Sequence, residues 1–187
     1  MVKAVILDCF GVLATEAWRP FKAKHFAHDP DLFRQASEIS WQADRGLISY
    51  RDFMVAIAKL AGITPAEAAS AIERNVPNEP LFEYLKELKP KYKLGFLSNV
   101  AGNYLHHIFT KEQLDLFDAV TLSYKKGWIK PQPEAFQDAA EELGVDMGEC
   151  VFIDDQQRNV TGARDAGMQA IYYQDVDSLK RELGELL

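Results

Sequence analysis

A short apolar run close to the start of the chain, residues 4–7, leads directly into an aspartate at position 8. An apolar run of this length that ends in turn-forming residues is typical of a strand buried in a parallel sheet. Open sheets of this kind bind their ligands at the carboxyl ends of the strands, which is where Asp8 would lie. The stretch therefore predicts a central strand, and Asp8 is either a buried structural group, a nucleophile or a metal ligand.

The second part of the chain, from residue 81 onward, alternates between two kinds of apolar pattern. Compact apolar runs predict further strands at residues 93–97, 117–122, 150–153 and 169–173. Patterns with helical spacing separate these runs. Strands that alternate with helices pair in parallel through right-handed crossovers. We therefore predict an α/β fold with a Rossmann-like three-layer core and a parallel sheet of about five strands, formed by residues 1–13 and 81–187.

Residues 14–80 contain no strand-like run, and their apolar residues recur at helical spacing. Ser49 precedes one such pattern and Gly62 closes it, as expected of a helix N-cap and C-cap. Thr64 and Glu67 have the spacing of a capping box, which starts another helix. We predict that this segment is an all-helical domain inserted between the two parts of the α/β core.

Composition limits the partners that the chain can have. Its 187 residues carry a net charge of −7, which argues against nucleic acid or an anionic membrane as the main partner. No apolar stretch is long enough to span a bilayer, and we expect no secretory signal. The two cysteines, Cys9 and Cys150, have no metal-binding spacing. We expect a cytoplasmic protein, either a monomer or a homodimer.

Three of the predicted strands end in polar residues that would meet at one edge of the sheet. These residues are Asp8, the pair Ser98 and Asn99, and the pair Asp154 and Asp155. Ser98 and Asn99 are also explained as an N-cap of the following helix. Adjacent carboxylates repel each other unless a cation or hydrogen-bond donors compensate, so Asp154 and Asp155 favour a cation with oxygen ligands.

Taken together, these strand ends resemble the motifs of the haloacid dehalogenase superfamily, most of whose members are Mg²⁺-dependent phosphatases. Residues 8–13 are similar to the first motif, Asp-x-Asp-Gly-(Thr/Val)-(Leu/Val), and Ser98 is similar to the second. Lys130, which alone would pass for an exposed loop lysine, matches the third motif, and Asp154-Asp155 match the fourth. The helical insertion, residues 14–80, occupies the position of the family's first (C1) type of cap.

The resemblance implies a two-step hydrolysis of a small phosphorylated metabolite. Asp8 would attack phosphorus to form an aspartyl-phosphate, which water then hydrolyses. Asp8, Asp155 and the backbone carbonyl of Phe10 would bind Mg²⁺. Asp154 would bind the same ion through water or orient Lys130.

The resemblance also implies how the phosphoryl group is held. Ser98 and Lys130 would neutralise charge on its oxygens. Gly11 would let the loop after Asp8 turn tightly, so that backbone N–H groups face the substrate. Asn99 would contact the leaving group or the attacking water.

Phe10 departs from the family pattern, because the first motif has a second aspartate at this position. That aspartate protonates the leaving alkoxide and later activates water. Phenylalanine keeps the backbone carbonyl but removes the acid, and general acid–base catalysis contributes about 10²–10⁴-fold. We therefore expect slow hydrolysis of ordinary phosphate esters and less impairment for leaving groups of low pKa.

Two alternatives remain open. An aromatic residue at position 10 is also similar to the 2-haloacid dehalogenases, which carry tyrosine there and use no metal. Against this, those enzymes have Ser-Ser-Asn where this chain has Asp154, Asp155 and Gln156, and Phe136 replaces a further tyrosine of theirs. The other alternative is a catalytically degenerate member that only binds a phosphorylated ligand or a protein, against which the intact nucleophile and lysine argue.

Substrate choice would depend on the helical insertion. Its candidate residues are Trp18, Arg19, Phe21, Trp41 and Arg45. Arg45, next to Gly46, is the candidate for an anionic group of the substrate, whereas helical aromatic residues are more often part of a core. His106 and His107 are candidates for the missing acid, although exposed histidines are the simpler interpretation.

Overall fold

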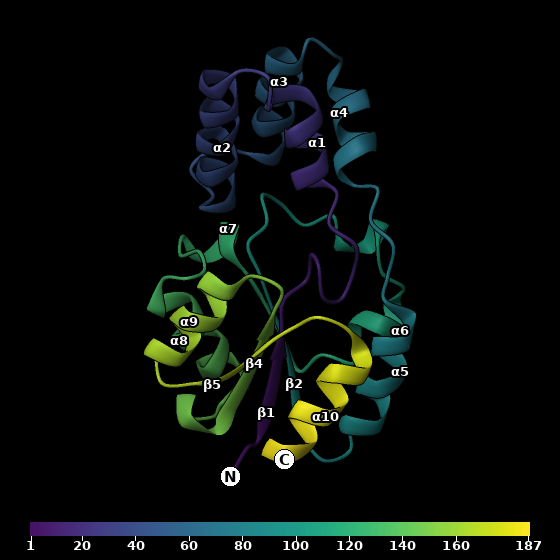
Figure 1. Cartoon of the computed structure of the whole chain (residues 1–187), viewed down its shortest axis with the longest axis vertical. Coiled ribbons are helices and arrows are strands. Elements are labelled where there is room, and N and C mark those ends of the chain that lie inside the picture. The colour runs from purple at the N-terminus through teal and green to yellow at the C-terminus, as the bar shows by residue number, and fades with distance from the viewer.

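A computed structural model describes residues 1–187, and its centre is a parallel sheet. The strands are β1 (Ala4–Leu7), β2 (Lys93–Ser98), β3 (Ala119–Leu122), β4 (Cys150–Asp154) and β5 (Gln169–Tyr172). Their order is β3-β2-β1-β4-β5, so β1 is central and pairs with β2 and β4 along its whole length (Figure 1). The predicted α/β fold with a five-stranded parallel sheet is confirmed.

Helices make up most of the remaining residues. In chain order they are α1 (Trp18–Phe26), α2 (Pro30–Asp44), α3 (Tyr50–Ala61), α4 (Pro65–Ile72), α5 (Glu79–Leu88), α6 (Lys111–Leu114), α7 (Ser123–Lys126), α8 (Pro133–Leu143), α9 (Gln157–Asp165) and α10 (Val176–Leu186). Two short 3₁₀ turns, η1 (Leu105–His107) and η2 (Met147–Glu149), complete the chain.

Helices on both faces of the sheet make the core a three-layer structure. Helices α5 and α10 contribute to a cluster of 26 buried hydrophobic residues on one face, and α8 and α9 to a cluster of 13 on the other (Figure 1). Val5 and Leu7 of β1 belong to the first cluster, and Ala4 and Ile6 to the second, because successive side chains of a strand point to opposite faces. Burial on both faces is why this strand is apolar throughout.

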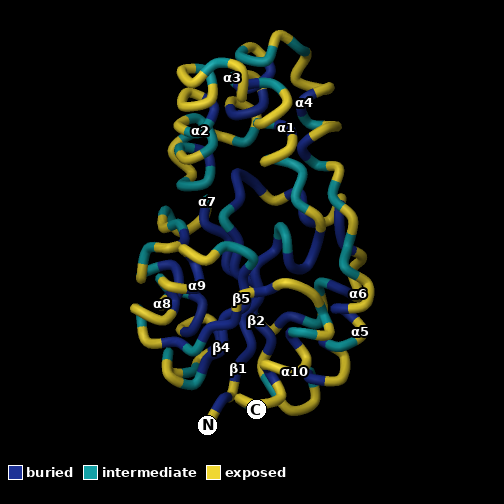
Figure 2. Tube along the Cα trace, viewed as in Figure 1, coloured by how far each residue is buried: buried dark blue, intermediate teal, exposed yellow.

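Helices α1 to α4 form a helical layer beyond the carboxyl ends of the strands (Figure 1). This layer has its own cluster of 11 buried residues, to which the loop after β2 adds Ala101, and Figure 2 shows buried positions inside it. The layer therefore packs around its own interior and faces the strand ends.

No single helix is long and apolar enough to cross a membrane. Helices α3 and α4 would suffice together by length and composition, but they meet at 104°.

The predicted helix ends in this layer are confirmed. Ser49 is the N-cap of α3 and accepts a hydrogen bond from the Asp52 N–H, and Gly62 ends the same helix in the left-handed conformation. Thr64 and Glu67 form the predicted capping box of α4. These ends were predictable because capping depends on residues close together in the sequence.

Two elements are shorter than the sequence predicts. The segment between β2 and β3 belongs to the patterns of helical spacing, but after β2 it forms only the 3₁₀ turn η1 before the short helix α6. Strand β3 begins at Ala119, although the apolar run starts at Phe117. The Phe117 ring packs against the rings of Phe82 and Phe96, with centroids 6.4 and 5.3 Å away, so its apolar character reflects core packing instead of strand pairing.

A glycine fixes the distance between the helical layer and the core. Gly46, just after α2, has a φ of +70°, and a Cβ at this position would lie 2.2 Å from the backbone oxygen of Tyr124 in α7. Gly62 has nearly the same φ, +69°, but nothing within 4 Å of its Cβ position. The turn after α2 thus rests directly on core backbone.

We predict that Gly46→Ala destabilises the protein more than Gly62→Ala. Both variants place alanine in the left-handed region, at a cost of about 1–2 kcal/mol. Only Gly46→Ala must also push the Tyr124 carbonyl away. Urea unfolding of both variants beside the wild type measures the difference, and equal losses of unfolding free energy would contradict a close contact at Gly46.

Candidate active site

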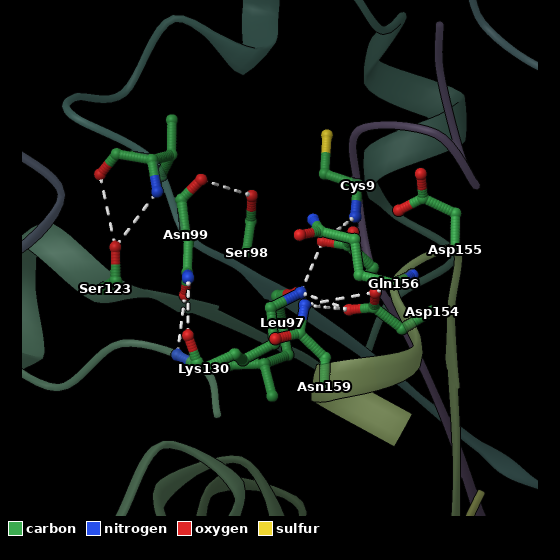
Figure 3. Close-up of polar contacts among 12 residues, drawn as sticks. Cys9, Leu97, Ser98, Asn99, Ser123, Lys130, Asp154, Asp155, Gln156 and Asn159 are labelled. Carbon is green, nitrogen blue, oxygen red and sulfur yellow. Dashed lines mark hydrogen bonds and ion pairs between the residues drawn. The ribbon is translucent and has the colours of Figure 1, made fainter. Parts of the chain in front are cut away.

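The centre of the site is the ammonium group of Lys130, which lies buried among the strand ends. Its Nζ donates to Asp8 Oδ1 at 2.5 Å, to Asp154 Oδ2 at 2.9 Å and to the backbone oxygen of Leu97 at 3.1 Å (Figure 3). The side chain of Lys130 is only 1% exposed. The ends of β1, β2 and β4 therefore meet on one cation, as the sequence predicts for parallel strands.

Asp154 is fully occupied in holding this arrangement. Besides the contact with Lys130, its Oδ1 accepts the backbone N–H of Gln156 at 2.7 Å, and both oxygens accept the Asn159 amide at 3.0–3.1 Å (Figure 3). Its side chain is 0% exposed. Of the two expectations for Asp154, the geometry fits orientation of Lys130.

The charges of Asp8 and Lys130 depend on each other. Burial raises the pKa of Asp8 to about 7, although the positive charge of Lys130 opposes this shift. Burial lowers the pKa of Lys130, but the attraction of Asp154 and Asp8 outweighs it and leaves that pKa above its ordinary value. A buried amine that keeps its proton can bind the oxygens of an anionic group beside Asp8.

The site has the features of a divalent-cation site with oxygen ligands. Carboxylate oxygens of Asp8, Asp154 and Asp155 all lie within 4.8 Å of one another. Asp155 Oδ1 is buried without a hydrogen-bond partner, while Oδ2 accepts Arg19 of α1 at 2.6 Å. Such an oxygen next to a second carboxylate fits Mg²⁺, because Mg²⁺ binds carboxylates and water. Asp8 and Asp155 would hold the ion there.

Gly11 does not have the role that the resemblance implies, which is to let backbone N–H groups face the substrate. It has a φ of +97°, and a Cβ there would lie 2.5 Å from the Asp155 carboxylate. Its N–H donates to the Ala14 backbone oxygen at 2.7 Å, so it is not available to a substrate. The tight turn expected at Gly11 is present, and it makes room for Asp155.

Asn99 lies beside Lys130, and Ser98 precedes it as the last residue of β2. Ser98 is buried, and its hydroxyl makes a long contact of 3.4 Å to the backbone oxygen of Asn99. The Asn99 side chain makes two hydrogen bonds with the Lys130 backbone. Asn99 Oδ1 accepts the Lys130 N–H at 2.8 Å, and Asn99 Nδ2 donates to the Lys130 carbonyl at 3.0 Å (Figure 3). Asn99 therefore fixes the lysine loop, although it also borders the cavity described next.

A cavity of about 980 Å³ separates the strand ends from the helical layer. Asp8, Phe10 and Lys130 border it from the core. The Phe10 ring is half-buried and lies 6.2 Å, centroid to centroid, from the Tyr104 ring. The opposite wall is a stripe of α2 at helical spacing, made of Ser37, Ser40, Trp41, Asp44 and Arg45. The cavity is large enough for a substrate much bigger than a phosphoryl group.

Most of the candidates from the helical segment border this cavity. Trp18, Arg19, Trp41 and Arg45 do so, whereas Phe21 is buried in the helical layer. Arg45 lies over the Trp41 ring at 4.8 Å, and its Nε is buried without a partner, which suits a substrate anion. His106 and His107 are exposed and do not border the cavity, so the simpler interpretation of them is confirmed.

Asp44 borders the cavity although the sequence did not single it out. Burial raises its pKa to about 7, against the attraction of Lys130 and a hydrogen bond from Ser40. The signal in the sequence is the polar stripe itself, since residues 37, 40, 41, 44 and 45 repeat at i, i+3, i+4, i+7 and i+8.

We predict that Asp44→Asn stabilises the protein at high pH. A carboxyl whose pKa is raised on folding contributes stability below its ordinary pKa of 3.8, and this contribution is lost as the pH rises to about 7. Asparagine has no charge to bury, so its advantage should grow over this range to at most about 4 kcal/mol. Urea unfolding at several pH values tests this, with Asp31→Asn, exposed on α2, as the control. A constant difference would contradict the shift.

Comparison with known proteins gives related hydrolases over most of the chain. The family model of haloacid dehalogenase-like hydrolases matches residues 2–167. An (S)-2-haloacid dehalogenase of Xanthobacter autotrophicus is 31% identical over 98% of this chain and 80% of its own length. A phosphatase of Mycobacterium tuberculosis is 43% identical over 76 residues, which are 38% of this chain and 35% of that protein.

A solved structure has the same fold over nearly its full length. It is a HAD family enzyme from Bacteroides thetaiotaomicron, 24% identical, with a TM-score of 0.81 and coverage of 97% of this chain and 98% of that one. The same enzyme in complex with magnesium and inorganic phosphate is 25% identical with a TM-score of 0.78, over 96% of this chain and 99% of that one.

Proposed function

The chain belongs to the haloacid dehalogenase-like hydrolases, and on this premise we propose that it hydrolyses a small phosphate monoester in a Mg²⁺-dependent reaction through Asp8. The observation that supports this most is the group of three carboxylates, Asp8, Asp154 and Asp155, with an unpartnered buried oxygen on Asp155. Three carboxylates at one point need more positive charge than Lys130 and Arg19 supply. A phosphoryl-transfer site with a divalent cation provides it.

The residues have separate tasks in this proposal. Asp8 attacks phosphorus from its strand end and carries the phosphoryl group until water releases it. Lys130, held by Asp154 and Asn99, neutralises a phosphoryl oxygen, and the Ser98 hydroxyl turns toward another. Mg²⁺, bound by Asp8, Asp155 and the Phe10 carbonyl, would reduce the repulsion between nucleophile and phosphate. Arg45 binds a second polar or anionic group of the substrate.

The second candidate is a metal-independent 2-haloacid dehalogenase, favoured by the match to the Xanthobacter enzyme and by the aromatic Phe10. The three carboxylates argue against this candidate, because a dehalogenase that binds no metal ion would leave their mutual repulsion without a divalent cation to offset it. The third candidate is a catalytically inactive member that only binds a phosphorylated ligand or a protein. The buried Asp8–Lys130 pair argues against it, because burying two charges costs desolvation free energy that a protein without catalytic need for them would avoid.

We further propose a small phosphorylated metabolite as the partner and a cytoplasmic location, without nucleic acid or membrane partners.

We predict that the protein hydrolyses 4-nitrophenyl phosphate with Mg²⁺ and not with EDTA. Asp8→Asn should lower the rate by about 10⁴-fold or more, because the amide cannot form the intermediate. Phosphate release at saturating Mg²⁺ measures both. Chloride release from 2-chloropropionate in EDTA would instead establish the dehalogenase, and inactivity on both substrates despite bound Mg²⁺ would favour the binding protein.

We predict that Arg19→Gln tightens the binding of Mg²⁺. The guanidinium pairs with Asp155 Oδ2, so a cation at Asp155 competes with it. A half-exposed ion pair is worth about 0.2–1 kcal/mol, which corresponds to at most about a fivefold change in Kd. Calorimetric titration with MgCl₂ tests this, and Arg34→Gln, which removes an exposed ion pair of α2, is the control. Weaker binding by Arg19→Gln would contradict the competition.

A further inference from the structure

We propose that Asp44 of α2 is the proton donor to the leaving group. It provides, from the helical layer, the acidic group that is absent at position 10, where the chain has phenylalanine. This inference rests on the proposed hydrolysis. The departing alkoxide of an ordinary phosphate ester needs a proton, and Phe10 has none to give. The donor must therefore come from another residue that borders the cavity.

The other carboxyl groups at the site are paired with cations. Asp8 and Lys130 pair with each other, and Asp155 pairs with Arg19. Glu16 accepts the backbone N–H of Arg19 at 3.0 Å and pairs with its guanidinium at the same distance, so both contacts turn its carboxyl toward Arg19. His106 and His107 lie outside.

Asp44 differs from these groups because it borders the cavity without an ion pair. It faces Lys130 from the core, Tyr104 from the loop after β2, and Arg45 beside it. Burial keeps the pKa of the Tyr104 phenol far above its ordinary value, so this phenol is a poor donor. Asp8 also borders the cavity and has a pKa near 7, but it is the proposed nucleophile. Asp44 has no such task, and its pKa is near neutrality, where a general acid works best.

The fold also fixes the position of this carboxyl relative to the nucleophile. Asp44 is the last residue of α2, and two residues later Gly46 rests on the Tyr124 backbone of the core. The charge of Lys130, whose Nζ touches Asp8, acts on the Asp44 carboxyl. A substrate whose phosphoryl group lies on Asp8 and Lys130 would thus point its ester oxygen toward the α2 stripe.

The protons balance over the two steps. In the first, Asp8 forms a bond to phosphorus, the ester P–O bond breaks with its electron pair on oxygen, and the Asp44 carboxyl gives its proton to that oxygen. In the second, water attacks the phosphorus of the aspartyl-phosphate and Asp44 takes one of its protons. Asp8 leaves as a carboxylate, inorganic phosphate is released, and Asp44 is protonated again.

The test compares two esters that differ in their need for a proton. 4-Nitrophenolate leaves without one at neutral pH, whereas the benzyl alkoxide does not. We expect Asp44→Asn to lower kcat/KM for benzyl phosphate by about 10²–10⁴-fold and for 4-nitrophenyl phosphate by less than about tenfold. Asp31→Asn should change neither. Phe10→Asp combined with Asp44→Asn should restore benzyl phosphate hydrolysis.

A second measurement does not depend on turnover. Carboxyl carbon NMR, assigned with Asp44→Asn, should show Asp44 titrating near pH 7. Titration in the ordinary range of an aspartate would overturn the proposal, as would an equal loss on both esters or no loss on either. A folded wild type that is inactive on both esters with Mg²⁺ would overturn the hydrolysis itself, a result distinct from these.

Discussion

The whole site depends on the ion pairs that the buried Lys130 ammonium makes with Asp8 and Asp154. The ammonium joins Asp8 at the end of β1 to Asp154 at the end of β4, and the Asn99 amide after β2 fixes its loop. Three neighbouring strands thus share one cation at their carboxyl ends. An isolated lysine there would lose its proton through burial, and isolated carboxylates would gain one. The attraction between Lys130 and Asp8 opposes the effect of burial on both groups.

The helical layer completes this charge arrangement from the opposite side. Arg19 of α1 reaches across to Asp155, and the polar stripe of α2 faces the strand ends over the cavity. Gly46 sets the distance between the two parts, because only a residue without a side chain fits against Tyr124. The layer thus contributes charged groups to the site as well as covering it.

The sequence determined the sheet, the helix caps and the core half of the site. Asp8, Ser98, Asp154 and Asp155 follow from their places at strand ends, because parallel strands bring their carboxyl ends to one edge. Lys130 lies in a loop before α8 and was predicted only through the family resemblance. Ser49 and Thr64 mark helix ends through contacts made within a few residues. The shorter β3 was missed because Phe117 is buried by distant aromatic rings, which a local pattern cannot reveal.

Only the tertiary structure decided which groups face each other across the cavity. Arg19 and Asp155 are 136 residues apart, and Asp44 is brought opposite Asp8 by the packing of α2 on α7. A residue's charge and type can be read from the sequence, but its pKa and its partner depend on burial and distance, which exist only after folding. The sequence therefore predicted Asp8 as the nucleophile, and the folded structure provided Asp44 as the candidate for the missing acid.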